Sequence, residues 1–467
     1  SRLKTSLVVK LLTRAHIYYY RQVLPRRPHA MAIHYFTPRN LNIALASMAM
    51  LQAPLDASLF PAAEESPPSR FIVPLHRQRV AVRSDDDTMS YKSVYFGTIS
   101  IGSPVKQQFS MVFDTGSGHV IVPSADCENA TCRMHRRYDR EASADAVDVD
   151  YDGTPVEPDA ARDQITVAFG TGEITGQFVH DRLCLGPQES MLMDGISSIL
   201  GSSHSSQEKA GCVNIRLVTA TEMTHEPFHA FAFDGILGLG LDSLALAPEF
   251  NFVAMMTKQK RLLHTNFGVF LAENDDEQSE ISFGGYSPER LRSPLSWAPV
   301  AHPELGYWQV HITSLRIGND THDFCSDGQC RAVVDTGTSL LAVPKAFADE
   351  LEQELGKSIR DPVLPPDTSH EGMSCKKAEG TPLHFDIAGA TLTLDPSDYA
   401  RPVVQLQESS LASSDEPMCR PTIMPIELAE PLGPKLFIWG EPFLKKYYTV
   451  YDWEHKSIGF GLAAHVP

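Results

Sequence analysis

The alternation of apolar and polar positions from about residue 94 onward predicts strands far more often than helices. Short runs rich in Val, Ile, Phe, Tyr and Thr are separated by Gly, Pro, Asp or Ser, as in all-β proteins. The expected strands cover residues 94–101, 109–113, 120–123, 164–169, 281–283, 308–317, 332–334, 391–394 and 447–452. Helical periodicity is expected over 249–260 and 344–355. The pattern therefore predicts an all-β protein with few short helices.

Two stretches interrupt this pattern and are expected to be long surface loops. Residues 134–163 are polar and acidic, and residues 187–211 are rich in Ser and Gly. Within the first, Asp148–Gly153 resembles the start of an EF-hand calcium loop. Its twelfth position is Asp159 rather than Glu, and helical flanks are missing, so a solvated acidic loop is the favoured interpretation.

The eight cysteines have spacings that suggest sequential pairing. No Cys-x-x-Cys occurs, which argues against a thioredoxin-like redox pair or a zinc knuckle. We expect disulfides in an oxidising compartment, with buried thiols as the alternative. The expected pairs are Cys127–Cys132, Cys184–Cys212, Cys325–Cys330 and Cys375–Cys419.

The charge is unevenly distributed. Residues 1–87 hold 12 Lys and Arg against 6 Asp and Glu, whereas the whole chain has a net charge of −18, so residues 88–467 carry −24. A body this acidic is a poor binder of nucleic acid or of anionic membrane.

The N-terminal part reads as leader segments. Residues 1–30 form an extension of uncertain meaning. Residues 31–57 have the order of a signal peptide, with Met31, Arg39, an apolar run over 41–51 and small residues after it. Residues 58–90 are expected to be a prosegment, because a basic strand precedes a very acidic body; a disordered leader is the alternative.

We therefore expect a protein of the secretory pathway, either extracellular or in an acidic vacuole or secretory organelle. No later run reaches the length of a membrane span, so the mature form is expected to be soluble. Asn129 and Asn319 begin glycosylation sequons.

The strongest chemical signal is a motif present twice, 221 residues apart: Val112–Ser117 and Val334–Ser339 both contain Asp-Thr-Gly after apolar residues. Each copy offers one carboxylate, Asp114 or Asp335, at the end of a buried strand. Two carboxylates in one site can share a single proton and activate water, without a metal or cofactor. Gly116 and Gly337 permit close approach of the backbone. Ser117 and Thr338 are expected to hydrogen-bond the outer carboxylate oxygens.

The chain resembles the pepsin-like aspartic endopeptidases over roughly residues 90–467. Besides the two motifs, the resemblance rests on residues 95–104, 233–240, 306–310 and 447–452. It implies two β lobes related by a pseudo-twofold axis with the cleft between them: an N-terminal lobe over 91–271 and a C-terminal lobe over 272–467. It also implies that Thr115 and Thr336 hydrogen-bond across the lobes. The Cys184–Cys212 pair is more similar to the plasmepsin-related branch.

The flap departs from the family pattern. The matching hairpin contains Phe169, Gly170 and Thr171, with Phe169 where the family usually has Tyr, and Ile121 stands where it usually has Trp. Since both partners of the usual hydrogen bond are replaced, we expect a flap held by apolar contact. The family usually has a smaller residue where this chain has Trp439, so the sequence does not show how the core behind the Asp335 loop is packed.

One further motif resembles a catalytic one, but we do not assign it a catalytic role. His225-Glu226-Pro227-Phe228-His229 matches the zinc-peptidase pattern His-Glu-x-x-His, which needs a helix, but its central Pro227 opposes one.

The resulting hypothesis is an aspartic endopeptidase, a hydrolase made as a zymogen and acting as a monomer on polypeptide substrates. Its own prosegment would be a partner. The alternative is a catalytically silent binding protein of the same fold. A third reading is a maturase that cleaves a few proproteins.

Overall fold

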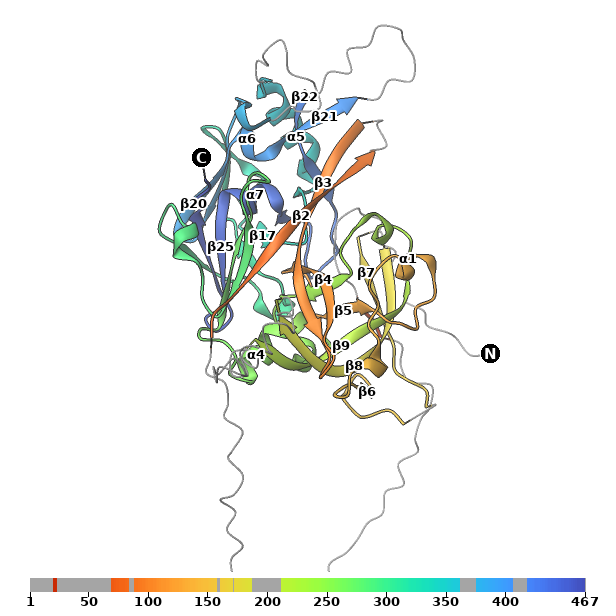
Figure 1. Cartoon of the computed structure of the whole chain (residues 1–467). Helices are drawn as coiled ribbons and strands as arrows, with labels where there is room; N and C mark the ends of the chain where they lie inside the picture. Colours follow the sequence, from red (N-terminus) through yellow and green to blue (C-terminus); the bar gives the residue numbers. More distant parts are fainter. Residues whose placement is uncertain are drawn as a thin grey trace, which may run out of the picture.

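The computed structural model describes residues 20–22, 69–83, 88–157, 160–170, 172–186, 211–361, 375–405 and 418–466. Strands dominate and the helices are short, so the predicted fold class is confirmed (Figure 1). The expected signal peptide, most of the N-terminal extension and nearly all of the loop 187–211 lie outside the described residues. No helix in the described part is long and apolar enough to cross a membrane.

The lobe that carries Asp114 is built mainly of strands, with short helices in the connections between them. Its strands are β3 (Thr88–Ile101), β4 (Gln107–Asp114), β5 (Val120–Pro123), β6 (Val147–Val149), β7 (Ile165–Phe169), β8 (Gly172–Leu185), β9 (Cys212–Met223) and β10 (Gly235–Gly238). Its helices are α1 (Ala130–Arg133), η2 (Arg140–Ala142), η3 (Phe228–Ala230), η4 (Asp242–Leu244), η5 (Pro248–Phe250) and α4 (Phe252–Lys258). β1 (Tyr20–Gln22) pairs with β7.

The lobe that carries Asp335 is likewise built mainly of strands with short helices. Its strands are β14 (Gln309–His311), β15 (Ser314–Ile317), β16 (Asp320–His322), β17 (Arg331–Val334), β18 (Leu341–Pro344), β19 (Leu383–Ile387), β20 (Ala390–Leu394), β21 (Ala400–Gln405), β22 (Met418–Pro421), β23 (Ile423–Ile426) and β24 (Leu436–Trp439). Its helices are η6 (Pro288–Arg290), η7 (Pro303–Leu305), η8 (Asp323–Cys325), α5 (Lys345–Ser358), η10 (Cys375–Lys377), α6 (Pro396–Tyr399) and α7 (Glu441–Lys446).

The strand pairing repeats between the two lobes. In the first, β10 runs parallel to β4 and antiparallel to β5, and β5 runs parallel to β9. In the second, β24 runs parallel to β17 and antiparallel to β18, and β18 runs parallel to β23. The two strands that end at the Asp-Thr-Gly motifs therefore occupy equivalent positions, as a pseudo-twofold relation requires.

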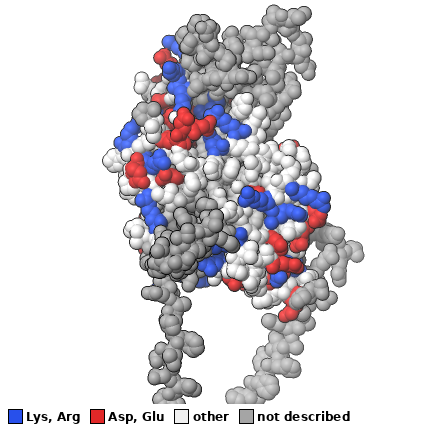
Figure 2. Space-filling model, in the orientation of Figure 1, with Lys and Arg blue, Asp and Glu red and all other residues white. Residues whose placement is uncertain are grey.

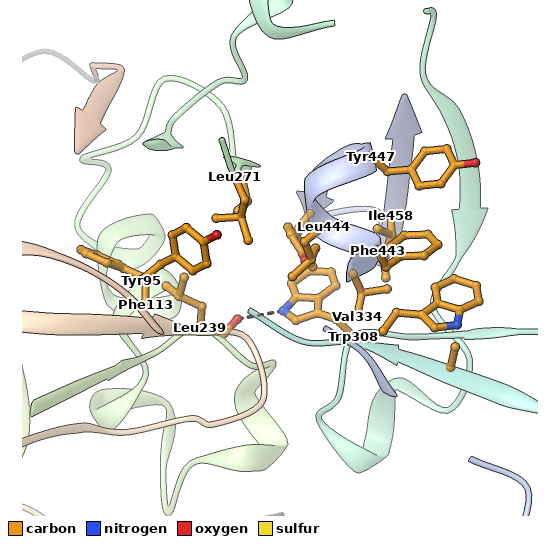
Figure 3. Packing of buried hydrophobic residues seen from close by; sticks show 14 of the residues in the cluster. Tyr95, Phe113, Leu239, Leu271, Trp308, Val334, Phe443, Leu444, Tyr447 and Ile458 are labelled. Carbon is orange, nitrogen blue, oxygen red and sulfur yellow. Dashed lines mark hydrogen bonds between the residues drawn. The ribbon is translucent and has the colours of Figure 1, made fainter. Parts of the chain in front are cut away.

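A shared sheet joins the lobes. β11 (Asn266–Phe270) pairs with β12 (Ser279–Phe283) and with β25 (Tyr447–Asp452), and β26 (Ser457–Leu462) lies between β25 and β13 (Ser296–Pro299). The boundary expected near Leu271 falls between β11 and β12. Figure 3 shows the adjoining core, where the Trp308 indole N–H donates to the Leu239 carbonyl at 2.8 Å and so connects elements of both lobes.

The segment expected to be a prosegment contributes a strand to this sheet. β2 (Phe71–Arg83) pairs with β12 through its first half and with β3 through its second (Figure 1). Val73 and Leu75 are buried. Residues 71–83 thus form a strand that is paired along its length in the structure.

Local details differ from the sequence prediction where tertiary contacts decide. The expected strand 308–317 is two strands, β14 and β15, and the expected helix 249–260 is η5 followed by α4. Residues 134–163 are not only loop, because β6 pairs with β8 and Asp148 forms an ion pair with Arg162 at 3.1 Å. The four expected disulfides are all present.

Candidate active site

Asp114 and Asp335 end equivalent strands and face each other at the junction of the lobes. Their exposed fractions are 1% and 2%. The Gly116 amide donates to Asp114 Oδ1 at 2.9 Å, and the Gly337 amide donates to Asp335 Oδ1 at the same distance. Each loop thus forms the same hydrogen bond to its own carboxylate, which holds the two side chains in equivalent orientations.

The glycines bring each loop against the opposite carboxylate. A Cβ on Gly116 would lie 2.9 Å from Asp335 Oδ1, and a Cβ on Gly337 would collide with Asp114 Oδ1. Only a residue without a side chain leaves room for this crossed arrangement. The two carboxylates therefore occupy one small site.

The threonines of the two motifs join the lobes, in the geometry that the family resemblance implies. The Thr115 amide donates to Thr336 Oγ1 at 3.0 Å, and the Thr336 amide donates to Thr115 Oγ1 at 3.0 Å. Each hydroxyl then donates to a carbonyl of the opposite lobe, Thr115 to Val334 and Thr336 to Phe113. These buried bonds hold the two loops at a fixed spacing.

The outer carboxylate contacts are asymmetric. Thr338 Oγ1 donates to Asp335 Oδ2 at 2.6 Å. The equivalent Ser117 was expected to do the same for Asp114, yet its buried hydroxyl has no hydrogen-bond partner among the described residues. The difference is one of side-chain orientation, which the matching motifs could not reveal.

The electrostatics of the pair favour one shared proton. Burial and the neighbouring Asp114 carboxylate raise the pKa of Asp335 well above its usual value, although the hydrogen bonds from Thr338 and Gly337 act in the opposite direction. Since two close carboxylates titrate as a unit, the raised pKa of Asp335 favours a state in which the pair holds one proton. A water between them could then lose a proton to one carboxylate while the other donates.

Trp439 fills the core directly behind the Asp335 loop. Its carbonyl accepts the Asp335 amide at 3.1 Å, and its ring stacks on Phe443 with centroids 4.4 Å apart. The indole N–H is buried and unpaired within the described structure. The bulky residue is therefore accommodated by an aromatic core.

A buried ion pair that the sequence analysis did not single out supports the same loop. The Glu441 amide donates to the Thr338 carbonyl at 2.9 Å, and its carboxylate accepts from the Tyr95 hydroxyl at 3.0 Å and contacts Lys445 at 2.5 Å. Burial lowers the pKa of Lys445 to about 8, although Glu441 acts against this shift. A Glu and a Lys four residues apart, directly after a buried strand, were the available signal.

The segment expected to be the flap is the hairpin of β7 and β8, which turns at Gly170 with a φ of 58°. Thr171 lies outside the described residues. Phe169 and Ile121 are both buried in one apolar cluster, and the Phe169 ring meets Phe228 edge-on at 6.0 Å. An apolar cavity beside them is lined by Ile121, Phe169, Ile174, Met223, Phe228 and Ile236, among others. These contacts are apolar, as the replaced residue pair predicts.

We expect a double-mutant cycle to show that the flap pair was exchanged as a unit. Phe169→Tyr puts a hydroxyl into an apolar site, and Ile121→Trp overpacks it, so each should lower the free energy of unfolding by about 1–3 kcal/mol. The double variant can form a Tyr–Trp hydrogen bond and should cost at least about 0.5 kcal/mol less than the sum. Urea denaturation measures all three; strict additivity would contradict the expectation.

Comparison with known proteins agrees with this geometry. The eukaryotic aspartyl protease family model matches residues 94–191 and 195–463. Cathepsin E from Rattus norvegicus is 31% identical over 379 residues, covering 80% of each chain. Vacuolar protease A from Aspergillus fumigatus is 30% identical over 79% of each chain. Pepsin A from Sus scrofa is 28% identical over 83% of this chain and 86% of its own. With two equivalent Asp-Thr-Gly loops on a bilobal β fold, the chain belongs to the eukaryotic aspartyl protease family and is an aspartic-type endopeptidase.

Proposed function

We propose that Asp114 and Asp335 are the catalytic pair of this endopeptidase. The ionised carboxylate takes a proton from a bound water, and the neutral one donates to the oxygen of the scissile carbonyl. The water attacks, a tetrahedral diol forms, and a proton passes to the leaving amine. The observation that carries the proposal is the buried pair of carboxylates, each hydrogen-bonded in the same way by its own loop.

The substrates we propose are extended polypeptides with large apolar residues at the scissile bond. The apolar cavity beside Phe169 supports this preference, because an apolar side chain gains by leaving water there. A peptide beneath the flap would bind as an added strand. Cleavage of a mixed peptide library tests the preference; cut sites at charged or small residues would contradict it.

The pH profile of peptide cleavage tests the proposed chemistry. Since the pKa of Asp335 is raised, its proton persists above the usual range of an aspartate, and activity should fall only as the pH rises through that raised pKa. The Thr338 hydroxyl stabilises the ionised form, so Thr338→Ala should move this falling limb to higher pH.

Ser117→Ala is the matched control, because the Ser117 hydroxyl has no partner in the described structure. It should leave the falling limb where it is. A Thr338→Ala profile that moves to lower pH, or equal shifts in both variants, would contradict the assignment.

The same pH series tests the proposed role of residues 58–90 as a prosegment. In addition to its strand pairing, β2 forms an ion pair with the acidic body between Arg77 and Asp275, and the hydrogen bond from Arg77 lowers the pKa of Asp275. Because this pKa is depressed, the stabilisation is present at higher pH and is lost as the pH falls through it. Acid should therefore loosen β2.

Intact-mass analysis after acid incubation is expected to show loss of the first 90 or so residues. Asp335→Asn should stay unprocessed if the chain cleaves itself. Full activity with an unchanged mass would contradict the prosegment role and would mean that β2 remains part of the working enzyme.

We further propose a location in an acidic vacuole, a secretory organelle or the extracellular space. Within the family, we propose that the chain lies close to the plasmepsin-related branch. The four disulfides support an oxidising route. Figure 2 shows acidic and basic side chains interspersed on the face it displays, rather than a basic field for polyanions. Cytosolic fluorescence of a tagged chain would contradict the location, and a tree of complete sequences tests the branch.

A further inference from the structure

The turn between β9 and η3 brings three potential metal ligands together. His225, Glu226 and His229 each offer one ligand atom, and these atoms lie within 4.8 Å of one another. No other group of this kind occurs among the described residues. His229 lies in η3, and its amide donates to the His225 carbonyl at 3.0 Å, so a single helical turn brings the two histidines together even though no longer helix forms.

The spacing of the three atoms matches that of metal ligands. Glu226 Oε1 lies 3.5 Å from His225 Nδ1 and 3.4 Å from His229 Nδ1. The two imidazole rings stack with centroids 3.8 Å apart, so the His225 ring, which is 64% exposed, must turn out of the stack to direct its in-plane lone pair at an ion shared with His229. Ligand atoms at about 2.0–2.1 Å from a tetrahedral zinc ion lie roughly 3.4 Å from one another. Imidazole nitrogens and a carboxylate oxygen are also ligand types that zinc takes.

Within the described structure, the ion-pair partners of Glu226 are the two histidines, and no Lys or Arg is paired with it. The side chains of His225 and Glu226 are 64% and 67% exposed, so an ion can reach them. His229 Nδ1 also lies 3.1 Å from the His225 carbonyl, to which it can donate a proton. Metal binding would move that proton to Nε2.

We propose that His225, Glu226 and His229 form a three-ligand site for a zinc-class divalent cation, with water completing the shell. The site borders the flap: Pro227 and the Glu226 carbonyl close off the space beside Gly172, and Phe228 packs on Phe169. An ion that fixes this turn is therefore expected to stiffen the base of the flap. The site has a structural role and takes no part in the chemistry of the aspartates.

Calorimetric titration of the full chain with zinc chloride at neutral pH tests the site. The native protein should bind one equivalent, and a cobalt-loaded sample should show the visible absorption of a tetrahedral site. Glu226→Gln and His229→Ala should each weaken binding by about tenfold or more. The Glu226 side chain is 67% exposed and that of His229 is 32% exposed, so neither substitution opens the core.

Two controls make the titration decisive. His302→Ala removes an imidazole that contacts Glu304 at 3.0 Å, in a pair without a third ligand among the described residues, and should bind zinc like the native protein. Asp335→Asn should also bind normally. Absence of saturable binding to the native chain, or equal binding by Glu226→Gln and His229→Ala, would overturn the proposal. Loss of binding only in Asp335→Asn would place the ion at the aspartates and would overturn it as well.

Discussion

Replacing Asp335 by Asn is expected to lower kcat/KM for peptide cleavage by about 10⁴-fold or more. The amide cannot exchange the proton that the pair must pass to and from water, and general acid–base steps of this kind contribute about 10²–10⁴-fold each. The Gly337 amide can still donate to the retained side-chain oxygen, so the loop should keep its shape. Initial rates with a fluorogenic peptide in mildly acidic buffer measure the loss.

The two aspartates should behave as one unit. Asp114→Asn should cost as much as Asp335→Asn, and the double variant should be little worse than either, because one missing partner already disables the pair. Asp276→Asn, at an exposed turn, is the charge-matched control and should retain full activity. Residual activity above about 1% in either single variant would contradict a shared role. A native protein that binds peptides without cleaving them would instead favour the silent-binding alternative.

Trp439→Ala is expected to lower the free energy of unfolding by about 3–5 kcal/mol, the usual cost of deleting a large buried aromatic side chain. The ring is fully buried against Phe443, Phe385 and Phe460, so its removal leaves a cavity. Because the Trp439 carbonyl accepts the Asp335 amide, movement of this strand should also reduce activity. Urea denaturation followed by tryptophan fluorescence and circular dichroism gives the stability change.

Two further variants test whether the cost comes from burial of the Trp439 ring rather than from the loss of any tryptophan. Trp297, 42% exposed, provides the matched control, and Trp297→Ala should cost no more than about 1 kcal/mol. Trp439→Phe loses contact area but also removes the unpaired indole N–H, so the two effects oppose each other and the net loss should stay below about 1.5 kcal/mol. Equal costs for Trp439→Ala and Trp297→Ala would show that the residue is not the support we infer.

Local sequence carried the information for the fold class and the candidate catalytic residues. The apolar runs before Asp114 and Asp335 predict buried strands, and the structure has them as β4 and β17. The duplicated motif predicted two equivalent positions because the same short sequence folds the same way in both lobes. The cysteine pairs were also readable, since sequential pairing needs only short loops for two of them and moderate loops for the others.

Features that depend on distant partners were decided only in the tertiary structure. Thr338 donates to Asp335 while the Ser117 hydroxyl has no partner in the described structure, although their motifs are nearly the same. The basic strand expected ahead of the acidic body is β2, but only the fold decided that its first half pairs with the distant β12 and its second half with the neighbouring β3. His225 and His229 meet because a single helical turn forms at this point despite Pro227, with the His229 amide bonded to the His225 carbonyl and the two rings stacked. Local pattern thus fixed what each segment forms, whereas side-chain orientation and strand pairing depended on the neighbours that folding brings together.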